Sequence, residues 1–263
     1  MGSQSGFERA IRQDRVIVLS GLVAITLLSW IYLARMASSM SAAAADAGMH
    51  AAMGMPEMSA WGMAELVMLF LMWAVMMVAM MLPSAAPIIW LVVGTYRRRG
   101  SGARALSSAF ASGYLTAWTV FSVVAAVTQL VLHRAALLSP AMATRSAIGG
   151  GAILLVAGAY QWLPLKRACL THCRSPLAFL AREWRDGTAG AFVMGVRHGL
   201  YCVGCCWALM LLLFAAGVMN LIWVAAIALF VLLEKLAPRG VMLGRVAGML
   251  LMAWGAWVLI RGG

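Results

Sequence analysis

The sequence predicts an all-α protein: a polytopic bundle of about seven transmembrane helices with its N-terminus in the cytoplasm. Hydrophobic residues make up 64% of the 263-residue chain, charged residues make up only 11%, and the mean hydropathy is +0.92. Apolar runs of about 20 residues, the length that crosses a bilayer as a helix, recur along the chain. The short alternating segments of a membrane barrel are absent, and a backbone in lipid must then satisfy its hydrogen bonds as helices.

The apolar runs and the segments between them suggest three regions. Residues 1–34 would form a cytoplasmic tail and a first membrane anchor, residues 35–61 a methionine-rich external loop, and residues 62–263 a six-span membrane domain. The basic tail and first apolar run could also be read as a signal peptide, but that run is long for one, so we expect an uncleaved anchor. The expected spans are residues 16–34, 62–82, 105–132, 143–162, 195–218, 221–236 and 241–260.

The basic residues predict the orientation of these spans. The formal net charge of +12 would suggest nucleic-acid binding in a soluble chain, but here the basic residues fall between the apolar runs. With seven alternating spans, all but four of the 20 Lys and Arg residues lie on the side of the N-terminus; the four exceptions are Arg35, Arg134, Arg145 and Arg261. Positive residues favour the cytoplasmic side, so we expect a protein embedded in the lipid bilayer with its N-terminus inside the cell, and no nucleic-acid partner.

The strongest chemical signal is the segment His198-Gly-Leu-Tyr-Cys-Val-Gly-Cys-Cys-Trp207 in the fifth expected span. Residues four apart share one face of a helix, so His198, Cys202, Cys206 and Met210 would form one row, with Cys205 beside it. Soft sulfur ligands with an imidazole suit Cu(I) or Zn(II), whereas a CxxC pair could equally be a redox couple. A buried cysteine can also be no more than a small apolar residue.

A second cysteine motif lies in the longest basic segment. Cys169 and Cys173 are four residues apart, with His172 directly before the second cysteine. If this piece is helical, both thiols face one way and could meet the thiols of the fifth span at the cytoplasmic side; otherwise they are free surface thiols. Five cysteines confined to residues 169–206 form a poor disulfide framework, which favours metal or redox chemistry.

Methionines supply the third signal. The segment before the second span is rich in methionine and is either a weak Cu(I) collector or a compositionally biased linker. Within the second span, Met68, Met72, Met76 and Met80 recur at every fourth residue, a row roughly 18 Å long that could be a thioether path or ordinary packing. Glu65 near its outer end is a further candidate because a carboxylate at membrane depth is costly, unless it is solvated at the interface.

Four motifs together resemble a widespread bacterial family of predicted metal-binding integral membrane proteins. They are Ala79-Met-Met-Leu-Pro-Ser-Ala-Ala-Pro87, Lys166-x-x-Cys169-Leu-x-x-Cys173-Arg-x-Pro176, His198 to Trp207, and Gly217-Val-Met-Asn-Leu-Ile-Trp223 followed by Glu234-Lys235. The likeness spans roughly residues 65–260. It implies a polytopic membrane protein with a metal site, and it implies Cys169, Cys173, His198, Cys202, Cys205 and Cys206 as candidate ligands. The Met-xxx-Met spacing is also similar to that of Ctr-type copper transporters.

We therefore expect an inner-membrane protein that handles Cu(I), by transport or by delivery to a copper enzyme, with zinc as the other possible metal. Its partners would be a metallochaperone or a copper-requiring membrane enzyme. A membrane thiol oxidoreductase and a structural or assembly subunit of a larger complex are the alternatives. No catalytic triad, phosphate loop or haem motif is recognisable, so no catalytic residue is assigned. The candidate metal ligands are Cys202, Cys205, Cys206, His198, Cys169, Cys173, Met72, Met76 and Met80, with Glu65, Met68, His172, Met210 and Glu234 as further candidates.

Overall fold

The computed structural model describes residues 2–52, 63–99, 102–139, 144 and 146–262, and the ordered elements of these residues are helices. In chain order they are α1 (Gly2–Ala52), α2 (Met63–Arg98), α3 (Ala103–Arg134), α4 (Ala147–Tyr160), α5 (Pro164–Arg174), α6 (Pro176–Glu183), α7 (Gly187–Ala216), α8 (Leu221–Leu236) and α9 (Gly240–Gly262). The all-helical prediction is confirmed for this part of the chain.

Five of these helices are long and apolar enough to cross a membrane: part of α1 (Gln13–Ser39), α2, α3, α7 and α9. Helices α4 and α5 would give a sixth span if they are counted as one, but they are bent by 64° at the break between them. Helix α8 has 16 residues, about 24 Å, which is short of a full crossing. The count of seven spans and the cytoplasmic N-terminus stay predictions.

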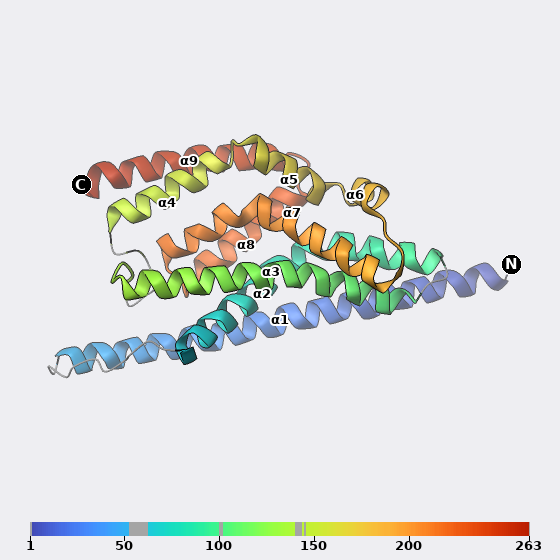
Figure 1. Ribbon diagram of the computed structural model, residues 1–263, viewed down its shortest axis with the longest axis horizontal. Coiled ribbons are helices and arrows are strands. Elements are labelled where there is room, and N and C mark those ends of the chain that lie inside the picture. Colours follow the sequence, from blue (N-terminus) through green and yellow to red (C-terminus); the bar gives the residue numbers. More distant parts are fainter. Residues whose placement is uncertain (1, 53–62, 100–101, 140–143, 145, 263) are drawn as a thin grey trace.

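The helices form stacked layers (Figure 1). Helices α4 and α9 pair on one side, α7 and α8 lie in the middle, and α1, α2 and α3 form the other side. The α4–α9 pair is close-packed, since a Cβ added to Gly158 would lie 2.7 Å from the Gly248 carbonyl oxygen. The contact of α3 with α7 is closer still: a Cβ on Gly195 would lie 2.0 Å from the Phe110 carbonyl oxygen. Small residues at helix contacts are typical of membrane bundles.

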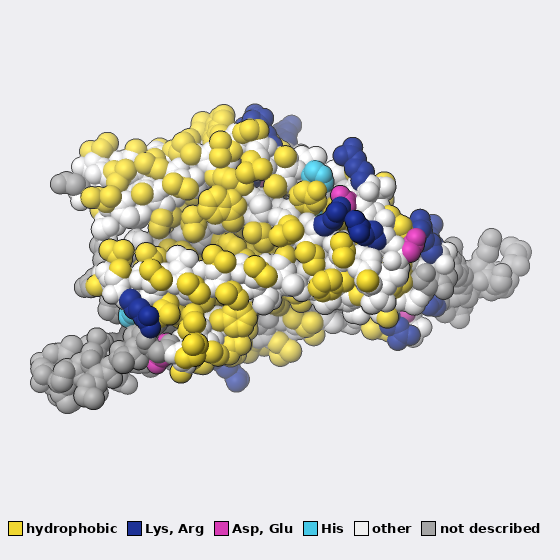
Figure 2. Space-filling view, in the orientation of Figure 1, with side chains coloured by type: hydrophobic (Ala, Val, Ile, Leu, Met, Phe, Trp, Pro, Cys, Tyr) yellow, Lys and Arg dark blue, Asp and Glu magenta, His cyan; other side chains and the backbone are white. Residues whose placement is uncertain are grey.

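Large apolar side chains cover much of the outer surface, among them Leu28 (65% exposed), Leu250 (66%) and Ile260 (82%). Figure 2 shows hydrophobic side chains over the flanks of the bundle and many Lys and Arg side chains at the end where α5 and α6 lie. Soluble monomers rarely expose so continuous an apolar surface, whereas lipid-facing helices require one.

The methionine-rich segment 35–61 differs in part from the loop expected from the sequence. Helix α1 continues to Ala52, so residues 35–52 of this segment are helical. Alanine and methionine are strong helix formers, and the run of alanines in this segment explains the extension. Residues 53–62, which include three of the methionines, lie outside the described residues.

Helix α2 also differs from expectation, because it continues past residue 82, the expected end of the second span. Pro83 and Pro87 lie inside one helix of 36 residues, where each lacks the backbone N–H that an α-helix uses. Close to the prolines, Ser84 Oγ and Tyr114 OH both donate to the Met81 carbonyl oxygen, at 2.8 and 3.0 Å. This part of α2 lies beside the thiols described next.

Candidate functional site: a buried thiol cluster

Three cysteines lie halfway along α7 and face the inside of the bundle. Cys202 and Cys205 are 1% exposed and Cys206 is 0% exposed. Because α7 is continuous here, the spacings of three and four residues bring these thiols to neighbouring positions on the buried side of the helix. With Cys173 of α5, whose sulfur approaches them, they form what we call the thiol cluster.

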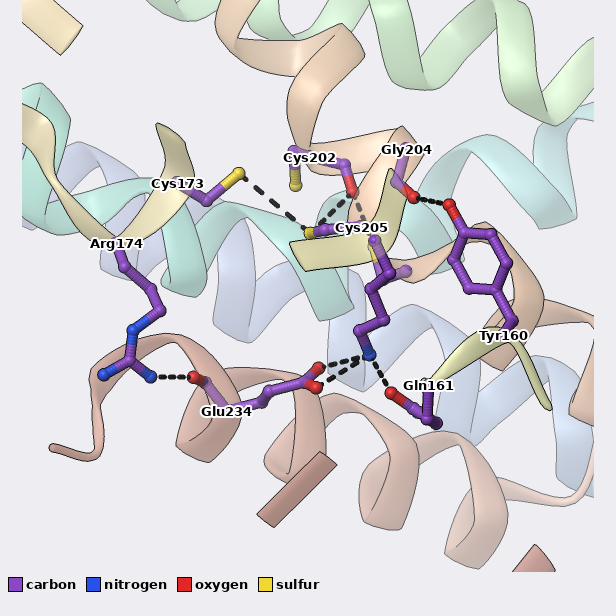
Figure 3. A network of polar contacts seen from close by, with 10 residues as sticks. Tyr160, Gln161, Cys173, Arg174, Cys202, Gly204, Cys205 and Glu234 are labelled. Atoms are coloured by element: carbon purple, nitrogen blue, oxygen red, sulfur yellow. Dashed lines mark hydrogen bonds and ion pairs between the residues drawn. The ribbon is translucent and has the colours of Figure 1, made fainter. Parts of the chain in front are cut away.

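Cys205 connects α7 to α5. Its sulfur lies 4.0 Å from the sulfur of Cys173, and Figure 3 shows the Cys173 side chain directed toward it. Cys205 Sγ also donates to the carbonyl oxygen of Cys202 at 3.1 Å. The two cysteine motifs, separated by about 30 residues in the chain, therefore meet in the folded protein, as the sequence predicted for a helical second motif.

Cys206 connects α7 to α2. Its thiol donates to the Cys202 carbonyl oxygen at 2.8 Å and lies 4.0 Å from the thioether sulfur of Met81. Cys169, the first cysteine of α5, lies against the backbone of Gly204, where an added Cβ would be only 2.8 Å from its sulfur. All five cysteines are free thiols.

Cys202 has polar partners from two other helices. Lys235 Nζ, at the end of α8, donates to its sulfur at 2.9 Å, and the hydroxyl of Tyr114 on α3 lies 3.1 Å from the same sulfur. The lysine also donates to Ser84 Oγ, between the two prolines of α2, at 2.9 Å. Cys202 is thus the point at which α2, α3, α7 and α8 are joined by polar contacts inside an apolar bundle.

Helix α5 is fixed in place by a second buried network (Figure 3). Lys166 forms an ion pair with Glu234 of α8 at 2.7 Å, with both side chains 2% exposed, and also donates to Gln161 Oε1. Arg174, at the other end of α5, donates to the carbonyl oxygens of Glu234 and Ala237 at 2.6 and 2.7 Å. A cation on the last carbonyls of a helix satisfies acceptors that have no partner within the helix.

The methionine row divides into an exposed start and a buried remainder. Met68 is 54% exposed, whereas Met72, Met76 and Met80 are at most 2% exposed and lie in the core. The member of α2 that reaches the cysteines is Met81, which is fully buried. Glu65, in the first turn of α2, is half-buried. Three of the four members of the row therefore face the interior, and Met81, directly after Met80 in the sequence, makes the contact with the thiol cluster.

The two histidines of the cysteine motifs, His172 and His198, contact aromatic rings. The His198 ring, 3% exposed, lies among the rings of Phe110, Tyr114 and Phe179, with centroid distances of 5.1 to 6.1 Å. Its Nδ1 is buried and has no hydrogen-bond partner among the described residues. His172 stacks on Tyr201 at 4.2 Å. These ring contacts do not place either histidine against a cysteine sulfur. The role of His198 and His172 as metal ligands therefore stays a prediction.

Within the described part of the chain, no three or more His, Cys, Asp or Glu side chains are arranged to hold one metal ion. What the fold supplies instead is sulfur pairs, Cys173 with Cys205 and Cys206 with Met81. Met210 is fully buried one turn beyond Cys206. Glu234, a candidate on sequence grounds, is engaged by Lys166.

Several residues of the site were not singled out by sequence reasoning: Lys235, Tyr114, Ser84, Met81 and Lys166. The sequence did offer a reason to single out the two lysines. An ionisable side chain within or beside an apolar span is rare and is a candidate functional residue by default. Lys235 ends an apolar run, and Lys166 precedes Cys169 by three residues. Nothing in the local sequence indicated that Lys235 would lie next to the cysteines of α7.

The fold and the site define a helical bundle with membrane-type helices and a buried cluster of thiol and thioether sulfurs. Residues 70–258 match the model of a family described as copper chaperone (PpoB2), and this match covers most of the chain. The protein belongs to that family. No curated protein and no solved structure matches the chain.

Proposed function

We propose that this protein is an inner-membrane copper chaperone that holds Cu(I) as cargo on the thiol cluster and passes it to a copper-requiring protein. The observation that carries the proposal is the 4.0 Å separation of the Cys173 and Cys205 sulfurs, which joins the two cysteine motifs. The family match, with its printed description of copper chaperone, supports the choice of metal.

The donor set suits this cargo. Metal–thiolate bonds of about 2.3 Å, as zinc makes them, allow two sulfurs up to about 4.6 Å apart to share one ion. Cys173 and Cys205 lie within that limit, as do the sulfurs of Cys206 and Met81. Thiolate and thioether ligands select Cu(I), whereas a structural zinc site is normally a closed set of four ligands. Sulfur pairs without further ligands favour a cargo that is taken up and released.

The buried methionines extend this donor set along α2. Thioethers bind Cu(I) without losing a proton, and Met72, Met76 and Met80 line the interior above Met81. We propose that they form an entry path that ends at Cys206. Thiolates bind Cu(I) more tightly than thioethers, so an ion moving along this row would collect on the thiol cluster.

The proposed orientation, with the N-terminus in the cytoplasm, is supported by ion pairs at one end of the bundle. Asp14 of α1 contacts Arg97 and Arg104 at 3.2 Å each, and Arg99 contacts Asp186 at 3.5 Å. Asp14 lies in the first third of α1, and the other residues lie at or next to the ends of α2, α3 and α7. All of them belong to the segments expected inside the cell.

Metal loading of the full chain tests the proposal. The protein would be purified in detergent under anaerobic, reducing conditions, loaded with Cu(I), desalted, and measured for copper by mass spectrometry. We expect stoichiometric copper in the wild type and a large loss in Cys173→Ser and Cys205→Ser. Met68→Leu, on the exposed start of the methionine row, is the matched control. Copper binding that survives replacement of all five cysteines would contradict the proposal.

A thiol oxidoreductase is the second candidate, because the same Cys173–Cys205 pair could cycle between dithiol and disulfide. Such an enzyme forms a mixed disulfide with its partner, which a variant lacking one cysteine of the pair would trap. A trapped partner in Cys173→Ser or Cys205→Ser cells, together with no copper in the purified wild type, would favour this candidate over the chaperone.

A further inference from the structure

The buried charges next to the thiol cluster do not balance. Lys166, Glu234 and Lys235 are 1%, 2% and 7% exposed, and the first two neutralise each other. Within the described part of the chain, Lys235 forms no ion pair with a carboxylate; its Nζ donates to Ser84 Oγ and to Cys202 Sγ, at 2.9 Å each. One positive charge is therefore left over in the interior, in contact with a thiol.

A buried ammonium is stable only when an opposite charge lies close to it, because its desolvation is costly. The serine hydroxyl and the Tyr114 hydroxyl are neutral, and Lys166 already uses Glu234. The remaining source of negative charge is sulfur: a Cys202 thiolate, or an anionic complex of thiolates with a metal ion. Lys235 thus requires that the cluster carry one net negative charge.

We propose that Lys235 makes the thiol cluster selective for a monovalent soft cation, Cu(I) or its analogue Ag(I), over divalent Zn(II). This inference rests on the proposed function. Two thiolates and one monovalent ion carry a single negative charge, which matches the single ammonium. Two thiolates and Zn(II) are neutral, so the ammonium loses its counter-charge, and the dication is also repelled more strongly. Excluding a competitor by an unfavourable charge is a recognised route to specificity.

The distances make this effect large. We take Cys202 of the thiol cluster as one of the two thiolates that hold the ion, and an ion bonded to its sulfur by about 2.3 Å lies at most about 5 Å from Lys235 Nζ. At an effective dielectric constant of about 20, one additional unit of charge at that distance changes an affinity on the order of 100-fold. Removing the ammonium should therefore improve Zn(II) binding relative to Cu(I) binding by about this factor. Ser84, the other partner of the ammonium, carries no charge and should have little influence on the ratio.

The test measures the affinities of the detergent-solubilised full chain for Cu(I) and Zn(II) separately, by competition with a colorimetric chelator for each ion. Lys235→Met removes the charge at similar length, Lys235→Arg keeps it, and Ser84→Ala removes the uncharged partner. We expect the ratio of Zn(II) to Cu(I) affinity to rise about 100-fold in Lys235→Met and to stay near the wild-type value in the other two. Lys235→Gln replaces Lys235→Met if the latter does not elute as a single species on gel filtration.

An unchanged ratio in Lys235→Met or Lys235→Gln, with Cu(I) binding intact, would overturn this inference and leave the proposed function standing. A similar rise in Lys235→Arg would also overturn it, because the effect would then follow shape and not charge. If the wild type binds neither Cu(I) nor Ag(I), the proposed function fails and the inference fails with it.

Discussion

The sulfur of Cys173, on a short helix that follows a 64° bend, lies 4.0 Å from the sulfur of Cys205, in the middle of the longest helix of the central layer. This contact joins two motifs from different parts of the chain. It also makes the position of α5 measurable, since two thiols this close can be linked by mild oxidation.

We expect diamide treatment of the membrane-embedded protein to form a Cys173–Cys205 disulfide, in which both thiols lose their hydrogens to the oxidant. Peptide mass spectrometry after alkylation would identify the linkage. Prior loading with Cu(I) should protect both thiols if they bind the ion. Cys169, whose neighbour on α7 is a glycine, serves as the control and should stay alkylatable. A dominant linkage between other cysteines would contradict the observed placement of α5.

The Lys166–Glu234 ion pair should be essential to stability because both side chains are 2% exposed. Glu234→Gln leaves a buried ammonium with no opposite charge, and we expect a loss of about 3–5 kcal/mol in the free energy of unfolding. The double variant Lys166→Met/Glu234→Leu removes both charges and should lose much less. Thermal unfolding in detergent would compare the three proteins. Equal destabilisation by the single and double variants would show that the pairing of charges is not what matters.

The close packing of α3 on α7 predicts a large effect of one methyl group. In Gly195→Ala the new Cβ would lie 2.0 Å from the Phe110 carbonyl oxygen, a backbone atom that cannot move without separating the helices. We expect a marked fall in thermal stability. Gly21→Ala, where an added Cβ meets nothing within 4 Å, is the control and should be neutral or stabilising by up to about 1 kcal/mol. Similar effects at both positions would argue against this packing.

The contact of Met81 with Cys206 predicts that the Met81 thioether contributes more to Cu(I) binding than the thioether of Met68 does. Met81→Leu keeps nearly the same volume, so it should cost less than about 1.5 kcal/mol in stability while removing a sulfur 4.0 Å from the Cys206 thiol. We expect the Cu(I) affinity to fall about tenfold or more, which corresponds to about 1.4 kcal/mol, or Cu(I) loading to become slower. Met68→Leu, at a half-exposed position, should leave both unchanged. Identical loading by both variants would remove Met81 from the proposed path.

Sequence periodicity predicted much of this molecule because helix formation and membrane insertion depend on local composition. The apolar runs predicted α3 and α9 nearly at their observed bounds, and they located α2 and α7, which are longer than expected because α2 continues to Arg98 and α7 begins at Gly187. The spacing of Cys202, Cys205 and Cys206 predicted their common place on the buried side of one helix. The bounds of α8 are those expected, whereas the extension of α1 to Ala52 was less predictable. Alanines and methionines that follow an apolar run can form either a linker or a continuation of the helix, and their local sequence does not distinguish the two.

By itself, the sequence determined that the chain is a bundle of apolar helices with clustered cysteines on one helix, because those properties follow from hydrophobicity and from residues repeating every three to four positions. Only the tertiary structure decided that Cys173 meets Cys205, that Lys235 contacts Cys202, and that His198 lies among aromatic rings. These contacts join helices distant in the chain. They depend on how glycines such as Gly195 allow helices to approach and on where the bend after α4 directs α5.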